Sequence, residues 1–313
     1  MLLAEIARLV QTEFAPGVQI SHATAAELLR IPLPRRMSYA VTGTVHARTA
    51  GYASPHVARG VRLHRGDEGP STTVSGVRLT DRVTTVSDLA PLLTLDELVE
   101  AMDALLVPRR PGAAYRALGE PLRRPDLISA IAALPPGKRG IRKLRTAADL
   151  AREGVESVME TRLRLLIVRL GFVEPHVNVG VPVPSQVPAP RGAAYVPPAR
   201  AERTADQRSV EASRRWVWPD LSYPSVKIGI EYDGEQFHLR DARQVARDRA
   251  RQDLLHAAGW RVLSFTAPDL DDPRRVIARL EGAGCPLAPR GLARRRRELE
   301  RLDLEWDQRS ARG

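Results

Sequence analysis

Two acidic residues lie close together in the second half of the chain, where the strand pattern is clearest. Between residues 226 and 233, apolar side chains alternate with Gly229, Glu231 and Asp233. The two-residue repeat of a strand places these three on one face, and Gly229 leaves room beside the carboxylates. Two carboxylates at the end of a strand could hold Mg²⁺ (or Mn²⁺), although a solvent-facing edge strand would show the same pattern.

A third acidic residue, Asp220, lies near the end of the preceding predicted strand. The sequence predicts a strand at Trp216–Leu221, a turn at Ser222–Ser225 and a strand at Val226–Tyr232. A β-hairpin of this kind brings Asp220 alongside Glu231. Converging carboxylates repel one another unless a cation neutralises them. We therefore expect Asp220 and Glu231 to share a metal ion, the alternative being that Asp220 is a simple turn residue.

Glu160 lies upstream of these strands on a helix predicted from Ser157 to Leu170. The helical repeat gives it the same face as three apolar residues, Leu163, Ile167 and Leu170. That face should pack on the sheet, where a carboxylate is costly unless it is paired or binds metal. Ser157 and Glu160 also have the spacing of a capping box. Glu160 is thus expected either to bind metal or to cap its own helix.

His238 follows Asp233 in the run Asp233-Gly234-Glu235-Gln236-Phe237-His238. A histidine just beyond a metal pocket could orient water or protonate a leaving group. The alternative is an exposed loop histidine with no chemical role.

Three arginines, Arg243, Arg247 and Arg251, recur every fourth residue on the next predicted helix. Like charges at this spacing slightly disfavour an isolated helix, and a phosphate partner would relieve the repulsion. We expect this basic stripe to bind nucleic acid. A solvated helix face, interleaved with Asp248 and Asp253, is the alternative.

The elements that must position these residues run helix, strand, strand, strand, helix, strand, helix. Their expected bounds are Ser157–Leu170, His176–Val181, Trp216–Leu221, Val226–Tyr232, Asp241–Ala258, Trp260–Thr266 and Pro273–Glu281. This order predicts an α/β sandwich with a mixed sheet flanked by helices. Residues 182–214 are rich in Pro, Ala and Arg and are expected to form a long loop or a partly disordered insertion.

The rest of the chain divides by its patterns. Residues 1–108 predict a small α+β domain, with β-rich runs that include Tyr39–Val45 and Val83–Val86. Thr24 and Glu27 have capping-box spacing. Residues 109–156 predict a helical connector, 157–285 the α/β domain, and 286–313 a basic tail.

The composition favours a polyanionic partner. The chain has 313 residues and a formal net charge of +11. A protein this basic meets nucleic acid more often than a membrane surface, although a genome rich in arginine codons would raise the charge as well. One cysteine excludes a disulfide within the chain and fits a cytoplasmic location. Because no stretch reaches the roughly 18 apolar residues of a membrane span, we expect no membrane partner.

The combined pattern of the second half resembles a known group. The strings are Pro219-Asp220, Ile230-Glu231-Tyr232-Asp233-Gly234, His238 and Gly259-Trp260-Arg261-Val262-Leu263. They are similar to the bacterial domain related to very-short-patch-repair (Vsr) endonucleases, within the PD-(D/E)xK nuclease superfamily. The resemblance covers about residues 157–270 and implies a restriction-endonuclease-like fold.

The resemblance also implies roles for single residues. Asp220 matches the metal-binding aspartate, Glu231 the acidic strand residue and Glu160 the helix glutamate. Asp233 and His238 resemble catalytic positions of the repair enzymes. Asp233 stands where the wider superfamily has a lysine, so the group that activates water, and whether the site is active, stay open.

The front half resembles the antitoxin-like region of AbiEi-type proteins. The strings are Ser21-His22-Ala23-Thr24-Ala25-Ala26, Val74-Ser75-Gly76-Val77 and Thr84-Thr85-Val86-Ser87-Asp88-Leu89. The resemblance implies DNA binding, or a protein partner or homodimer formed through this domain. A full winged helix-turn-helix, often first in such proteins, is not evident.

Two hypotheses follow for the whole chain. The first is a Mg²⁺-dependent DNA endonuclease acting in repair, defence or a toxin–antitoxin setting, in which Asp220, Glu231 and Glu160 hold metal. The second is a non-catalytic DNA-binding regulator that retains a nuclease-like fold. DNA rather than RNA follows from the resemblance alone.

Overall fold

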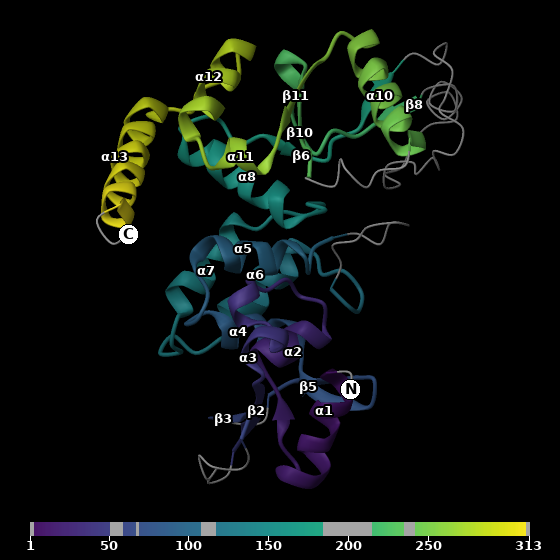
Figure 1. Cartoon of the computed structure of the whole chain (residues 1–313), viewed down its shortest axis with the longest axis vertical. Coiled ribbons are helices and arrows are strands. Elements are labelled where there is room, and N and C mark those ends of the chain that lie inside the picture. The colour runs from purple at the N-terminus through teal and green to yellow at the C-terminus, as the bar shows by residue number, and fades with distance from the viewer. Residues whose placement is uncertain are drawn as a thin grey trace. The chain divides into compact units, whose positions relative to one another are not determined.

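The chain forms two compact units, Met1–Thr161 and Arg162–Gly313. The computed structural model describes residues 3–50, 59–66, 69–107, 117–183, 215–234 and 242–310, without the side chains of 215, 242–248 and 302–310. Most of the inserted loop expected at 182–214 lies outside these residues. Figure 1 traces both units along the chain, and each is described by itself.

The first unit contains a five-stranded mixed sheet in the order β3-β2-β1-β5-β4. The strands are β1 (Gln19–Ile20), β2 (Val45–Thr49), β3 (Val61–Arg65), β4 (Ser71–Val74) and β5 (Val77–Thr80). Ile20 pairs with Ala47 on one side and Leu79 on the other, and all three are fully buried. Their neighbours Gln19 and Arg48 pair in the same register and point to the opposite face, which is polar.

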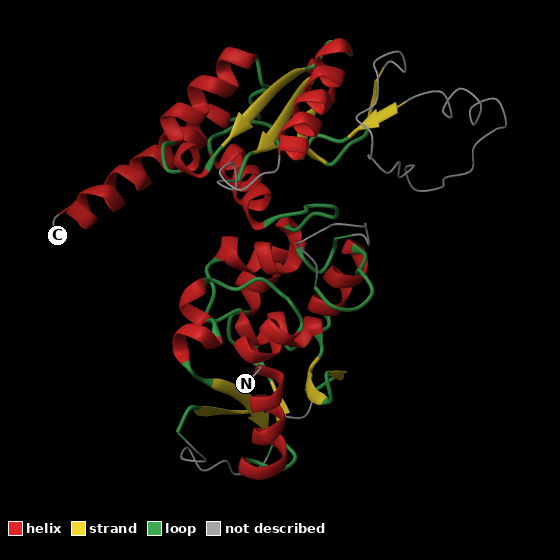
Figure 2. Cartoon of the chain, turned by 45° about the vertical axis from the view of Figure 1, so that its right-hand side comes forward, coloured by secondary structure: helices red, strands yellow, loops and turns green. Residues whose placement is uncertain are grey.

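Short helices make up the remainder of this unit (Figure 2). They are α1 (Leu3–Leu9), a π-helical turn (Val10–Phe14), α2 (His22–Leu28), a 3-10 turn (Arg35–Met37), α3 (Tyr39–Thr42), α4 (Arg82–Leu89), α5 (Leu95–Asp103), α6 (Arg124–Ala132) and α7 (Ile141–Leu150). Thr94 and Glu97 form a complete capping box at the start of α5. The buried side chains of Leu98 and Met102 then give α5 its core face.

Two strand predictions in this unit are wrong. Most of the run Tyr39–Val45 forms α3, which ends at Gly43 in the left-handed conformation. The run Val83–Val86 lies inside α4, where the Asp81 side chain accepts a hydrogen bond from the Thr84 amide at 2.7 Å. A capped start and the packing of one face outweigh the strand preference of β-branched residues.

The capping box expected at Thr24 and Glu27 does not form either. Helix α2 already begins at His22. The Thr24 hydroxyl accepts a hydrogen bond from the His46 amide at 2.9 Å, and the Glu27 carboxylate accepts one from the Tyr39 amide at 2.5 Å. Both side chains therefore tie α2 to other elements of the unit.

The second unit has a four-stranded sheet and a separate two-stranded one. The four-stranded sheet runs β11-β10-β9-β6, with β10 parallel to β11 and antiparallel to β9. The strands are β6 (His176–Val177), β7 (Val181–Val183), β8 (Arg215–Val217), β9 (Leu221–Tyr223), β10 (Ile228–Tyr232) and β11 (Arg261–Phe265). With its flanking helices, this mixed sheet makes the protein a member of the α/β class.

The strand expected at Trp216–Leu221 is divided in the structure. Its first part is β8, which pairs with β7, and its last residue opens β9. Trp218 and Pro219 interrupt it, since proline cannot donate to a sheet ladder.

Helices cover both faces of the four-stranded sheet. The helices of this unit are α8 (Val158–Arg169), α10 (Ala242–Ala257), α11 (Ala267–Leu270), α12 (Pro273–Ala283) and α13 (Gly291–Ser310). Ile228 and Ile230 join one apolar core with residues of α8 and α12. Leu254 and Leu255 of α10 join a second core with β7, β8 and Val262. Alternate residues of β10 thus face different helices, and Glu231 faces α10.

Part of the segment expected as a basic tail is the helix α13, held against the unit at its start. The backbones of Gly171 and Gly291 cross so closely that a Cβ on either would overlap the other. Arg294 and Arg295 donate hydrogen bonds to the carbonyls of Val168 and Leu170 at 3.2 and 2.9 Å. These cations cap the C-terminal end of α8, where the helix dipole favours positive charge. No helix among the described residues is long and apolar enough to cross a membrane.

Candidate functional site: the carboxylate pair of the β9–β10 hairpin

The hairpin of β9 and β10 brings Asp220 and Glu231 to one place. Leu221 pairs with Ile230 and Ser222 with Gly229. The turn is a 3-10 helix at Pro224–Val226, followed by Lys227 in the left-handed conformation. One further step of the same register sets Asp220 opposite Glu231, as the hairpin pattern predicts.

Asp220 fixes the end of this hairpin. Its Oδ2 atom accepts a hydrogen bond from the Tyr232 amide at 2.9 Å, and its carbonyl accepts one from the Asn178 amide at 3.0 Å. The Asp220 side chain thus accepts a hydrogen bond from β10 just beyond the last main-chain pair of β9 and β10. Its orientation toward β10 is therefore set by the backbone.

Arg251 of α10 bridges the two carboxylates. Its Nη2 atom lies 2.6 Å from Glu231 Oε1 and 3.8 Å from Asp220 Oδ1. The same nitrogen donates to the Trp218 carbonyl at 2.9 Å. Glu231 is 7% exposed, and a carboxylate this buried needs a partner charge. The guanidinium supplies it.

Among the described side chains, the site has a net negative charge, because one guanidinium faces two carboxylates. Mg²⁺ accepts oxygen ligands and is often held by one or two carboxylates, with waters or substrate phosphate completing its shell. The donor set of Asp220 and Glu231 fits such an ion once Arg251 moves aside. Among the described residues, no three His, Cys, Asp or Glu side chains converge as a metal site.

The space expected beside Gly229 for a metal ion is occupied by the Pro219 side chain. A Cβ placed on Gly229 would lie 3.3 Å from the Cβ of Pro219. The glycine therefore allows Pro219 to pack closely, and the predicted gap for a metal ion is absent at this position. Any ion would have to bind further along the strand, nearer Glu231.

The other two acidic candidates each have contacts of their own. Glu160 belongs to the first unit. Its amide donates to Ser157 Oγ at 3.1 Å, and its Oε2 atom accepts from the Glu156 amide at 2.9 Å. Glu160 therefore caps the start of α8, in a variant of the predicted box that uses Glu156. Its role as a metal ligand stays a prediction.

Asp233 continues the acidic face just beyond β10. Its amide donates to the Phe265 carbonyl at 2.8 Å, so the chain stays paired with β11 at this point. The residue is half-buried. Its catalytic role stays a prediction.

The remaining predicted residues are only partly placed. His238 lies outside the described residues. Arg243 and Arg247 lie in α10, as expected from their spacing, but their side chains are outside the description. Arg251 is the member of the stripe whose side chain is described, and it contacts carboxylates.

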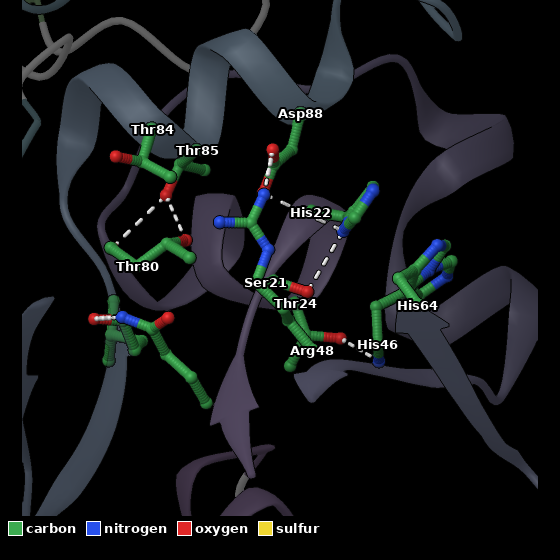
Figure 3. Close-up of polar contacts among 12 residues, drawn as sticks. Ser21, His22, Thr24, His46, Arg48, His64, Thr80, Thr84, Thr85 and Asp88 are labelled. Carbon is green, nitrogen blue, oxygen red and sulfur yellow. Dashed lines mark hydrogen bonds and ion pairs between the residues drawn. The ribbon is translucent and has the colours of Figure 1, made fainter. Parts of the chain in front are cut away.

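A second polar cluster, in the first unit, escaped the reasoning from sequence (Figure 3). His46 and Arg48 on β2 lie on the same sheet face as His64 on β3, because Arg48 pairs with His64. His22 and Asp88 approach them from α2 and α4. The signal in the sequence was the two-residue alternation of polar side chains in both strands, together with an aspartate next to the buried Leu89 at the end of α4.

Comparison of the chain with protein-family models, with curated proteins and with solved structures found no match in any of the three.

Proposed function

We propose that the second unit is a restriction-endonuclease-like domain that hydrolyses phosphodiester bonds of DNA with the help of Mg²⁺ or Mn²⁺. The observation that carries the proposal is the register of β9 and β10, which sets Asp220 opposite Glu231 under the cationic Arg251. A mixed sheet with helices on both faces and carboxylates at a strand end is compatible with such a fold.

In this proposal, the chain's own residues do three things. Asp220 and Glu231 present oxygen atoms to the metal ion, and the Tyr232 amide keeps Asp220 pointed at the site. Arg251 leaves the carboxylates and binds a phosphate oxygen of the DNA, which suits its forked donor geometry. A bound Mg²⁺ would lower the pKa of a water and offset the charge developing on the phosphate.

Further residues take supporting roles in the proposal. His238 acts as acid or base, Asp233 helps to orient the attacking water, and Glu160 is a candidate third metal ligand. Arg243 and Arg247 bind the DNA backbone from α10. The formal net charge of +11 supports a polyanionic partner.

Plasmid cleavage tests the proposal. Supercoiled DNA is incubated with the full chain and Mg²⁺ or Mn²⁺, and nicked and linear products are quantified. We expect Asp220→Asn and Glu231→Gln to lower cleavage at least about a hundredfold, since each removes a charged ligand of the metal. Asp253→Asn, an exposed carboxylate of the same helix as Arg251, should cleave like the parent chain. Absence of cleavage by the parent with either metal would sink the proposal.

A second candidate is a non-catalytic DNA-binding regulator that retains a nuclease-like fold. The observation that favours it is the ion pair of Arg251 with Glu231, which satisfies the buried carboxylate without a metal. This candidate requires the parent and Glu231→Gln to bind DNA equally while neither cleaves it. For the first unit, by resemblance to AbiEi-type proteins, we propose DNA binding, or a protein partner or homodimer.

A further inference from the structure

Four elements of the first unit bring polar side chains together in one cluster (Figure 3). We call this the histidine cluster, and define it as His22, His46, His64, Arg48 and Asp88. His22 opens α2, His46 and Arg48 lie on β2, His64 lies on β3, and Asp88 lies near the end of α4. Lys138, in the loop before α7, reaches the same aspartate.

The three imidazole rings form a stack. The ring centroids of His22 and His64 are 3.6 Å apart with 17° between their planes. His46 Nδ1 lies 2.9 Å from His64 Nε2, a hydrogen bond that requires a lone pair on one ring. Burial, and after it nearby positive charges, lower the pKa of His46 and of His64 to about 4. At neutral pH the rings are therefore uncharged and can donate and accept hydrogen bonds.

Among the described side chains, cations outnumber carboxylates around this stack. Arg48 Nη2 and Lys138 Nζ both contact the same atom, Asp88 Oδ1, at 2.5 and 3.2 Å. Arg62 is exposed on β3, and its charge acts on both His46 and His64. Within the described part of the chain, the cluster therefore has three nearby cations and one aspartate, and an anion would balance this charge.

The arginine in the cluster has a donor without an acceptor. Arg48 Nε is buried and has no hydrogen-bond partner within the described part of the chain. Gly66 and Gly69 lie against this guanidinium, and a Cβ on them would stand 3.2 Å from Nε and 3.3 Å from Nη1. Neither glycine covers the guanidinium with a side chain. A buried N–H without an acceptor is costly, and an anion would supply one.

The cluster can also accommodate a proton. Asp88 Oδ2 has no hydrogen-bond partner among the described residues and lies 4.0 Å from His22 Nδ1. A protonated His22 would be paired by this carboxylate. An incoming anion would favour that protonation, because it adds negative charge beside the ring.

We infer that the histidine cluster binds a phosphate group, carried by a free phosphate compound or by nucleic acid. Guanidinium, ammonium and imidazole donors around one point match the several acceptor oxygens of a phosphate. A metal ion fits less well, since Arg48 and Lys138 already occupy Asp88. The partial exposure of Lys138 and His22, at 26% and 12%, gives a ligand access. This inference is independent of the nuclease proposal.

Titration calorimetry on the full chain, in EDTA and at moderate salt, tests this inference. The probes are inorganic phosphate and a short oligonucleotide with or without a 5′-phosphate. We expect phosphate, or the oligonucleotides, to bind, and His64→Gln and Arg62→Gln to weaken that binding at least about tenfold. Both replaced side chains are partly or fully exposed, and a thermal melt checks that each variant folds. His256→Gln, an exposed histidine of α10, should bind like the parent.

Comparison of the probes identifies the source of the phosphate group. Binding of inorganic phosphate that depends on His64 assigns the site to a free phosphate compound. Binding that depends on His64 and is confined to oligonucleotides assigns it to nucleic acid. Two results would overturn the inference: no binding of any probe, or binding that His64→Gln and Arg62→Gln leave unchanged. In a separate titration without EDTA, Zn²⁺ binding that depends on His64 and excludes phosphate would overturn it too.

Discussion

The carboxylates of Asp220 and Glu231 share one cationic partner among the described residues, Arg251. Glu231 is buried, and its one described cation is Arg251, which is about one-third exposed. A buried carboxylate that loses its partner charge is destabilising, whereas its interaction with a metal would replace that partner. In the proposed metal site, the same residue would therefore link the stability of the second unit to its affinity for the ion.

Replacing Arg251 should separate these two effects. We expect Arg251→Gln to lower the free energy of unfolding by about 1–3 kcal/mol without metal, because Glu231 stays buried and unpaired. Adding Mg²⁺ should raise the melting temperature more in this variant than in the parent, since the competing guanidinium is gone. Thermal melts with and without Mg²⁺ provide the measurement. Arg249→Gln, exposed on the same helix, is the control, and equal Mg²⁺ shifts in all three chains would contradict the competition.

The histidine cluster should make the first unit sensitive to acid. In the folded chain the pKa is about 4 for His46 and His64 and about 2 for His22, below the value of 6.5 for an ordinary histidine. As pH falls below 6.5, these histidines bind protons in the unfolded chain but stay neutral in the folded chain. Stability is therefore lost from about pH 6.5 down to pH 4, with a limiting slope of about 1.4 kcal/mol per pH unit for each histidine.

Denaturation by urea at pH 7 and pH 5 measures this loss. Burial raises the pKa of Asp88, so its protonation in the folded state opposes the loss only at the acid end. Arg48, Arg62 and Lys138 stay charged throughout this range. We expect His46→Gln combined with His64→Gln to flatten the pH dependence relative to the parent. A parent chain equally stable at both pH values would contradict the lowered pKa values of these histidines.

At the scale of the elements, the crossing of two glycines decides where α13 attaches. Gly171 ends the turn after α8, and Gly291 begins α13. Their close approach leaves the arginines of α13 within reach of the carbonyls of α8. The helix is thus positioned by contacts between backbones as well as by its charge.

A methyl group at this crossing should displace α13. A Cβ on Gly291 would lie 2.1 Å from the Gly171 carbonyl oxygen, so Gly291→Ala requires the backbone to move. We expect a loss of about 1–3 kcal/mol in the stability of the second unit. Gly282→Ala is the matched control, because a Cβ there meets nothing within 4 Å and alanine favours the helix. Chemical denaturation measures both, and equal stability of the two variants would refute the crossing as a constraint.

At the scale of the whole molecule, the formal charge of +11 governs encounters with polyanions. The two units have separate cores, so this charge is spread over two folded bodies. Some arginines are already used inside the fold, such as Arg295 on the α8 carbonyl and Arg251 on Glu231. Others, such as Arg296, are exposed and can meet a ligand.

DNA binding by the full chain should weaken steeply with salt. Each phosphate contact releases counterions from the duplex, so the logarithm of the binding constant should fall linearly with the logarithm of salt concentration. For about six contacts we expect roughly a thousandfold loss between 50 and 200 mM salt. Fluorescence anisotropy with a labelled duplex measures the slope. A binding constant insensitive to salt would contradict phosphate contacts as the source of affinity.

Local patterns were sufficient for some of the fold and part of the site. The alternation around Glu231, the turn after Asp220 and the helical spacing of Arg251 predicted elements that the structure contains. These signals are local, because strand periodicity and turn residues depend on neighbours in the chain. The same kind of signal failed at Val83–Val86, where the cap at Asp81 and packing override β-branched propensity.

Only the tertiary structure decided which partners these side chains meet. The packing of α10 on the sheet places Arg251, an expected phosphate ligand, beside Glu231 as its counter-ion. The parallel pairing of β2 with β3 and the approach of α2 and α4 gathered the histidine cluster from four distant segments. Sequence patterns assign side chains to faces, whereas contacts depend on which faces meet, and that follows from the order of strands and the burial of apolar area over the whole unit.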